Sequence, residues 1–342
     1  VGAAAAAEFI LSGAPLPAGK AVELGVADGL IDPRRDRVDQ AVEFALRPGL
    51  ATRPIRALPV RDAATADAAL EQLLKKVQAR RHGQIAPRHI INAVRASFTA
   101  PSFETGLRTE GEEFGVLLAS PEARALQHVF FAERAAAKIA PQYKAEPRKI
   151  TKVGVVGAGT MGGGIAMCCA NVGIPVILVD VSAEGLNKGL AVVKKNYARS
   201  VQRGSITQEQ MDRRVGLIAG TVNYASLSQV DLVIEAVFED LSLKKKVFAQ
   251  LDAVCPAHCV LATNTSYLDI DDIASATKRP ASVVGAHFFS PANVMRLLEV
   301  VRGCKSSPVT ISTMMAFGKR IKKLSVLAGN CDGFVGNRMV TS

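Results

Sequence analysis

The segment VGVVGAGTMGGG, residues 153–164, constrains the fold of this chain more than any other stretch. A β-rich run ends in Gly157-x-Gly159-x-x-Gly162 and leads into a helical pattern, and Asp180 closes a second apolar run roughly 20 residues later. This order of strand, glycine turn, helix, strand and acid predicts a βαβ unit that binds a dinucleotide. Gly157 permits the tight turn, Gly159 lets the backbone approach a pyrophosphate, and Gly162 lets the helix pack closely on the strand. Asp180 is expected to bind the adenosine ribose.

The alternation of strands and helices that follows predicts the fold class. Helical patterns separate most of the apolar runs typical of strands, which lie at 152–157, 175–180, 216–219, 231–235, 259–263 and 283–287. This alternation predicts an α/β domain at 151–342, a doubly wound, Rossmann-type sheet that is mostly parallel and covered by helices on both faces.

The first 150 residues have a different organisation. Residues 1–34 hold an Ala-rich helix, a Gly/Pro break and a second short helix, a piece too small to form a core alone. Residues 35–150 have apolar side chains at helical spacing, with helices expected at 38–46, 64–81, 87–96, 103–118 and 121–138. Proline at both ends of 141–147 indicates a linker. The 342 residues are therefore predicted to form three parts: 1–34, 35–150 and 151–342.

Residues 183–214 are long for a connection between two strands. We expect two helices joined near 203–205, the second capped by Thr207, forming a hairpin that projects from the sheet. Its basic side chains fit either a phosphorylated substrate tail or an ordinary solvated face; they are Lys194, Lys195, Arg199 and Arg203.

Composition narrows the classes of partner. The net charge is +11, but the basic residues are dispersed and no aromatic residues interleave with them. We therefore expect an anionic small molecule rather than nucleic acid. No apolar run approaches the length of a membrane span. The six cysteines are expected to be reduced thiols of an intracellular protein. The segment Cys255-Pro-Ala-His258-Cys259 lacks a second ligand cluster, so no metal site is predicted.

Polar residues follow the strands in the second half of the predicted sheet. One strand runs into a polar cluster that ends at Ser266, and the next ends in His287, at the edge where doubly wound sheets bind ligands. Glu299 is a lone carboxylate within an apolar run, and burying it requires a partner. A histidine–carboxylate pair suits general-base catalysis, because the carboxylate fixes the tautomer and stabilises the protonated ring. The alternative for His287 is a packed core histidine.

Five motifs together resemble the 3-hydroxyacyl-CoA dehydrogenase family over 151–342: GAGTMGGGIA, EAVFEDLSLKKKVF, TNTSYLDI, GAHFFSPANVMRLLEVV and DGFVGNR. The first 34 residues resemble the C-terminal end of an enoyl-CoA hydratase/isomerase (crotonase) domain. The helical middle, with ARALQHVFFAERAAAKI, is similar to the linker of multifunctional β-oxidation enzymes. The whole chain therefore resembles bifunctional enoyl-CoA hydratase/3-hydroxyacyl-CoA dehydrogenases.

This resemblance implies roles for individual residues and NAD as the cofactor. His287 matches the catalytic base, Glu299 its orienting carboxylate, Ser266 the serine that contacts substrate and nicotinamide, and Asn337 the asparagine near the reacting hydroxyl. The further residues at cofactor positions are Met161, Asp180, Val237, Phe238, Glu239, Lys244 and Ser290. Ser290 departs from the family, which often has asparagine there. Helix capping is the alternative role for Ser266 and Asn337, and plain surface exposure is the alternative for Lys244.

The resemblance also implies an L-3-hydroxyacyl-CoA substrate and a 3-ketoacyl-CoA product in fatty acid β-oxidation. It places the hydratase residues before Val1 and an all-helical dehydrogenase domain after Ser342. Two other functions stay open: a dehydrogenase of a small β-hydroxy acid without CoA, and a non-catalytic NAD-binding relative. We expect a bacterial cytoplasmic protein, with a peroxisomal one as the alternative, and a monomeric parent protein.

Overall fold

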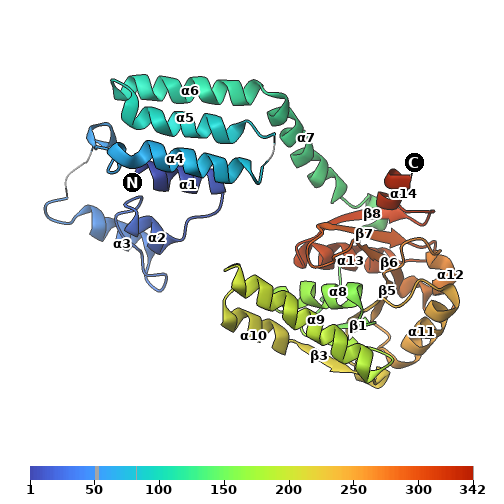
Figure 1. The fold of residues 1–342 in the computed structure, drawn as a ribbon. Helices are drawn as coiled ribbons and strands as arrows, with labels where there is room; N and C mark the ends of the chain where they lie inside the picture. Colours follow the sequence, from blue (N-terminus) through green and yellow to red (C-terminus); the bar gives the residue numbers. More distant parts are fainter. Residues whose placement is uncertain (51–53, 82, 342) are drawn as a thin grey trace. The chain divides into compact units, whose positions relative to one another are not determined.

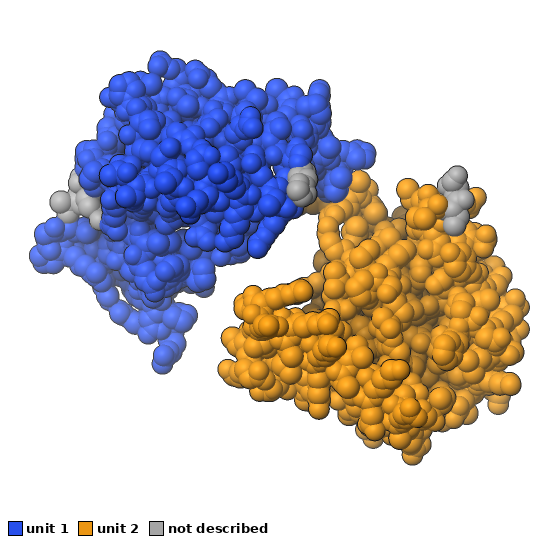
Figure 2. Space-filling model, in the orientation of Figure 1, with its two compact units in different colours: residues 1–130 blue, residues 131–342 orange. Residues whose placement is uncertain are grey.

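The computed structural model describes residues 1–50, 54–81 and 83–341. They fall into two compact units, 1–130 and 131–342 (Figure 1, Figure 2). We call these the helical unit and the sheet unit. Among the described helices, none combines the length and the apolar character needed to cross a bilayer.

The helical unit encloses one small apolar core. Leu70 and Ile91 pack against Ala7 and Leu11, and all four side chains are buried. The helices of this unit are α1 (Ala3–Ser12), α2 (Ala18–Glu23), α3 (Arg37–Ala45), α4 (Ala63–Gln78), α5 (Ala86–Thr99), α6 (Phe103–Ala119) and the first part of α7 (Pro121–Ala136), with the 3₁₀ turn η1 (Ile55–Ala57). The five helices predicted in this region are confirmed, with ends that differ by up to three residues.

The first helix shares its core with α4 and α5, so residues 1–34 lie in the same compact unit as the helices that follow them. The carboxylate of Asp62 also accepts hydrogen bonds from the backbone N–H groups of Ala3 and Ala4, at 2.6 and 3.0 Å. These bonds satisfy two of the free donors at the start of α1. The compact units thus divide the chain after residue 130, whereas the sequence predicted boundaries after 34 and 150. The assignment of 1–34 to a crotonase domain stays a prediction.

The sheet unit is built on one eight-stranded sheet in the order β3-β2-β1-β4-β5-β6-β7-β8. Neighbouring strands are parallel except β6 and β7, which are antiparallel. The strands are β1 (Val153–Val156), β2 (Val176–Val179), β3 (Ile218–Thr221), β4 (Leu232–Glu235), β5 (Val260–Thr263), β6 (Val283–Phe288), β7 (Leu297–Arg302) and β8 (Leu324–Gly329). The six predicted strands are confirmed within two residues at each end. The other two, β7 and β8, were not predicted as strands.

Helices cover both faces of this sheet and bury a separate apolar cluster on each. One face holds α8 (Thr160–Asn171), α9 (Ala183–Gln202), α10 (Gln208–Gly216) and α13 (Pro308–Arg320). The other holds α11 (Leu241–Val254), α12 (Ile270–Ala274) and the turn η3 (Tyr224–Leu227). The predicted doubly wound α/β fold is confirmed. The remaining elements are η2 (Pro141–Tyr143), η4 (Pro280–Ser282) and α14 (Gly336–Thr341).

Both predicted connections contact the sheet unit. The hairpin of α9 and α10 forms as predicted, and one side of α9 packs on this unit. Val193 and Tyr197 of α9 are buried in the core, and the Tyr197 hydroxyl bonds to Asn171 Oδ1 of α8 at 3.0 Å. Residues 141–147, where the sequence predicts a linker, also contact this unit. The backbone N–H of Ala145 donates to Ser312 Oγ of α13 at 2.9 Å, which fixes this segment to the sheet unit.

Candidate active site

The glycine turn between β1 and α8 has the geometry that its sequence predicts. Gly157 has φ +99°, and a Cβ there would lie 2.6 Å from the carbonyl oxygen of Ala236. A Cβ on Gly162 would lie 1.7 Å from the carbonyl oxygen of Gly157, because α8 packs directly on the turn. At Gly159 a Cβ would meet nothing within 4 Å, so the backbone there faces open space. These three environments match a tight turn, close helix packing and a free approach for a ligand.

A cavity of about 810 Å³ opens over this turn. The start of α8, one side of α9 and the loop 236–238 after β4 all line it. The predicted cofactor residues among its lining are Gly157, Gly159, Met161, Asp180, Val237 and Phe238. The carboxylate of Asp180 accepts a hydrogen bond from the backbone N–H of Ala158 at 2.8 Å, so it also holds the glycine turn. The free N–H groups at the start of α8 and the acid at the end of β2 fit a dinucleotide.

One side of α9 contributes lining residues that sequence reasoning missed, among them Lys188, Val192 and Asn196. Gly189 allows this contact, because a Cβ there would lie 2.1 Å from the carbonyl oxygen of Ala158. The spacing of Gly185 and Gly189 on one helical face is the signal that could have revealed it. Ser290 is not part of the lining, whereas Pro291 and Asn293 are.

His287 and Glu299 meet directly across β6 and β7. They are paired residues in the antiparallel register, and His287 Nδ1 lies 2.6 Å from Glu299 Oε2. Both side chains are buried. The rings of Phe289 and Phe334 pack near the imidazole, with centroid distances of 4.5 and 5.7 Å. With Nδ1 donating to the carboxylate, the lone pair of the neutral ring is on Nε2. The predicted pairing of His287 with Glu299 is therefore present, and the role of His287 as a base stays a prediction.

The segment before α14 completes this arrangement. Glu299 Oε1 accepts hydrogen bonds from the backbone N–H groups of Val335 and Gly336, at 3.0 and 2.7 Å. Asn337 Nδ2 donates to the carbonyl oxygen of Ser266 at 3.3 Å. The structure thus brings four predicted site residues, from widely separated parts of the sequence, to the same end of the sheet. Their individual catalytic roles stay predictions.

Comparison with known proteins decides the family. Residues 152–331, just over half of the chain, match the family model described as "3-hydroxyacyl-CoA dehydrogenase, NAD binding domain". The chain belongs to this dehydrogenase family. The family resemblance and the NAD cofactor predicted from the motifs are therefore confirmed.

Named relatives extend the similarity beyond that domain. The peroxisomal bifunctional enzyme of Homo sapiens is 43% identical over 355 residues, covering 99% of this chain and 47% of that protein. The fatty acid oxidation complex subunit alpha of Shewanella amazonensis is 36% identical over 350 residues, covering 99% of this chain and 49% of that protein. The chain spans about half the length of the curated relatives it matches.

Solved structures resemble the sheet unit's fold. A crystal structure of (S)-3-hydroxybutyryl-CoA dehydrogenase from Ralstonia eutropha is 38% identical with a TM-score of 0.55, covering 56% of this chain and 68% of that chain. The dehydrogenase part of multifunctional enzyme 1 from C. elegans is 33% identical with a TM-score of 0.53, covering 59% of this chain and 48% of that chain.

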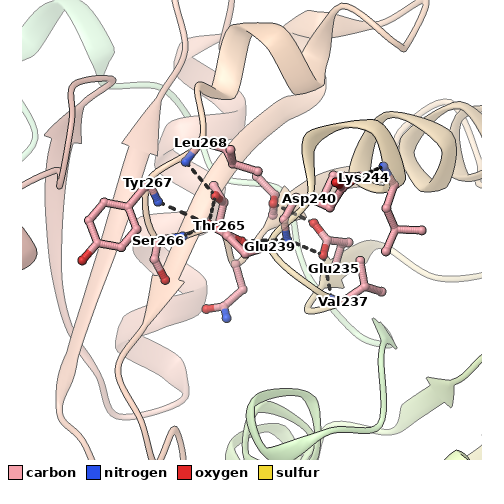
Figure 3. A network of polar contacts seen from close by, with 12 residues as sticks. Glu235, Val237, Glu239, Asp240, Lys244, Thr265, Ser266, Tyr267 and Leu268 are labelled. Atoms are coloured by element: carbon pink, nitrogen blue, oxygen red, sulfur yellow. Dashed lines mark hydrogen bonds and ion pairs between the residues drawn. The ribbon is translucent and has the colours of Figure 1, made fainter.

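Glu239 and Lys244, which the sequence also places at cofactor positions, belong to a polar network beside the cavity (Figure 3). Lys244 is wholly buried, and its Nζ lies 2.8 Å from Glu235 Oε1 and 3.3 Å from Glu239 Oε2. Glu239 Oε1 accepts hydrogen bonds from Thr265 Oγ1 and from the backbone N–H of Ser266, at 2.5 and 2.7 Å. Neither Lys244 nor Glu239 lines the cavity, and a plain surface position for Lys244 is wrong. Sequence reasoning missed Glu235.

The network makes Glu239 a pH-sensitive group. Burial alone would raise the pKa of this carboxyl, but the hydrogen bonds from Thr265 and Ser266 and the charge of Lys244 outweigh it and lower the pKa. Because the pKa is lower in the folded state, the ionised carboxylate stabilises the fold at pH values above the ordinary glutamate range. This contribution is lost as the pH falls through the lowered pKa. We expect Glu239→Gln to lower stability by about 0.5–1 kcal/mol at pH 7, an amount discounted for partial exposure.

This loss should shrink as the pH falls from the ordinary glutamate range, about 4.3, towards the lowered pKa of Glu239 in the folded protein. Urea unfolding at several pH values measures it. Glu43→Gln in the helical unit, which removes an exposed partner of Arg35, is the control and should change little. An equal loss at pH 7 and pH 3 would contradict this account of Glu239.

Proposed function

We propose that the sheet unit catalyses the NAD-dependent oxidation of an L-3-hydroxyacyl-CoA to the 3-ketoacyl-CoA, as a step of fatty acid β-oxidation. The observation that carries the proposal is the buried His287–Glu299 pair, with Nδ1 and Oε2 2.6 Å apart, in the same sheet as the glycine turn. A packing role alone would not require a buried carboxylate that two backbone N–H groups also hold in place.

In this mechanism His287 Nε2 accepts the proton of the substrate's 3-hydroxyl group. Glu299 stabilises the imidazolium that forms, and the N–H groups of Val335 and Gly336 fix the carboxylate. The Ser266 hydroxyl and Asn337, whose side-chain amide donates to the backbone carbonyl oxygen of Ser266, would orient the substrate's hydroxyl. When bound, NAD would supply the acceptor for the hydride that leaves the carbon bearing this hydroxyl group. Holding hydroxyl, base and cofactor in one geometry provides much of the acceleration.

The acyl-CoA substrate is supported by the relatives' names and by the basic residues of the α9–α10 hairpin. Lys194, Lys195, Arg199 and Arg203 are all exposed, as a contact with CoA phosphates requires. The alternative substrate, a small β-hydroxy acid, would not use them. Rates of NADH oxidation with acetoacetyl-CoA and with acetoacetate, measured in the full-length protein, discriminate the two.

We expect turnover of acetoacetyl-CoA that free CoA inhibits, and little turnover of acetoacetate. Acetoacetate turnover that is insensitive to CoA would support the alternative substrate. NADH binding without turnover of either compound would support a non-catalytic relative.

We also propose that the full-length protein is a bifunctional hydratase/dehydrogenase, since relatives that match almost the whole chain include peroxisomal bifunctional enzymes. These relatives support the peroxisomal alternative for its compartment. The relative from Shewanella is bacterial, and its name states no compartment. A hydration assay with crotonyl-CoA on the full-length protein tests the second activity, and its absence would contradict this proposal.

The site should prefer NAD to NADP. Asp180 directly follows β2 and lines the cavity, and Val181 and Ser182 supply no arginine for a 2′-phosphate. Like charges brought together cost several kcal/mol, so NADPH should bind about 10²-fold more weakly than NADH. Titration of each nucleotide by fluorescence measures this ratio. Similar dissociation constants would mean that Lys188, which lines the same cavity, neutralises the phosphate.

A further inference from the structure

Glu235 is a buried charged residue beside the cofactor cavity. It does not line the cavity itself, so a direct contact with the cofactor does not explain its presence. It is the last residue of β4, and its side chain is 0% exposed. The next three residues, 236–238, form a loop that lines the cavity. Since an isolated carboxylate in such a place would be strongly destabilising, its partners show what it does.

Three donors from three elements meet at this carboxylate. Oε1 accepts from the backbone N–H of Val237 at 2.7 Å and from Lys244 Nζ at 2.8 Å. Oε2 accepts from the Thr263 hydroxyl at 2.7 Å. Glu235 therefore ties the cofactor loop to α11 and to the end of β5. Figure 3 shows Glu235 next to Val237, and Glu239 between Glu235 and the Ser266 loop.

The loop 236–238 is connected both to the glycine turn and to the Ser266 loop. The carbonyl oxygen of Ala236 lies against Gly157, where a Cβ would approach it to 2.6 Å. A shift of the loop would therefore disturb the glycine turn as well. On the other side, Lys244 also contacts Glu239, whose carboxylate holds the backbone N–H of Ser266.

We propose that Glu235 is a positioning residue that holds the loop 236–238 in its cofactor-binding conformation through the N–H of Val237. A loop that is fixed before the ligand arrives loses less conformational freedom on binding, and the affinity rises accordingly. This inference uses the NAD site, and its effect on turnover rests on the function proposed above.

Two double variants isolate the acceptor from the charge. E235Q/K244M and E235M/K244M both replace the buried ion pair by neutral side chains of similar size, which proteins often tolerate. Only E235Q/K244M keeps an oxygen for the Val237 N–H. Any direct contact of Lys244 with the cofactor is lost in both and cancels in the comparison.

We expect E235M/K244M to bind NADH about tenfold or more weakly than E235Q/K244M, as befits an N–H that has lost its acceptor. Amide hydrogen exchange without NADH should be faster over 236–240 in E235M/K244M, and similar in both variants over 247–254. Equal NADH affinities and equal exchange would overturn the proposal. These readouts need no substrate, so they remain decisive even if the protein does not oxidise 3-hydroxyacyl-CoA.

A second pair covers the case in which E235M/K244M does not fold. Glu235→Gln and Asp252→Asn each remove one carboxylate from an ion pair of α11, since Asp252 Oδ1 lies 2.8 Å from Arg279 Nε. Asp252 does not line the cavity. Both variants should melt at a lower temperature. Only Glu235→Gln should weaken NADH binding, by several-fold, because the neutral amide oxygen is a weaker acceptor for the Val237 N–H than the carboxylate is. The same NADH affinity in both variants would show that Glu235 is only structural.

Discussion

His287→Gln should lower kcat for 3-hydroxyacyl-CoA oxidation by about 10²–10⁴-fold, the range for loss of a general base. Glutamine can still bond to Glu299 across β6 and β7, but it cannot take up the hydroxyl proton. NADH affinity should change little, because the imidazole is not part of the lining of the cofactor cavity. Steady-state kinetics and NADH titration of the full-length protein measure the two quantities separately.

A second histidine–carboxylate pair provides the control. His89 Nδ1 contacts Glu113 Oε2 in the helical unit. His89→Gln changes the same type of contact outside the sheet unit, so kcat should stay near that of the unmodified protein. Near-normal turnover of His287→Gln would return His287 to the role of a packed core residue.

Gly162→Ala and Gly159→Ala should separate the folding role from the binding role of the glycine turn. At Gly162 the added Cβ would lie 1.7 Å from a backbone carbonyl oxygen, so α8 must move away from the turn. We expect a loss of about 1–3 kcal/mol in stability, the usual range for overpacking, together with weak NADH binding. Thermal unfolding should detect a shift of several degrees.

At Gly159 the added Cβ meets nothing within 4 Å, and the backbone has φ −67° and ψ −170°, which any residue adopts. Gly159→Ala should therefore melt like the unmodified protein. NADH binding should still fall by about 10–100-fold, because the methyl group occupies the space where a pyrophosphate approaches the backbone. Normal NADH affinity in this variant would place the pyrophosphate elsewhere in the cavity.

Features that depend on local chemistry were predictable from the sequence. The turn at Gly157 needs a positive φ, and the close helix at Gly162 needs a missing side chain, so both are marked by residue type alone. The six strands and the long helices follow from apolar periodicity, which adjacent residues set. The five motifs and their order along the chain also identified the family, which the match over residues 152–331 confirms.

Contacts between distant segments were predictable only where a chemical need pointed to a partner. The buried Glu299 required one, and His287 was the natural candidate, but the register of β6 and β7 places them opposite each other. Glu235 is also a lone carboxylate within an apolar run, LVIEAVF, but nothing in the sequence indicates its partners. Its contacts form only when the sheet order brings β4 next to β5 and α11 brings Lys244 to Glu235.

The sequence by itself thus determined the glycine turn, the acid after β2, the class of the sheet and the identity of the candidate base. The tertiary structure alone decided that α1 packs with α4 and α5, that residues 141–147 bind to α13, that α9 forms one wall of the cofactor cavity, and that Glu235, Lys244 and Glu239 form one network. The reason is physical. Backbone preference and periodicity act between neighbours in the chain, whereas strand order, register and buried charge pairs depend on which distant segments the hydrophobic core brings together.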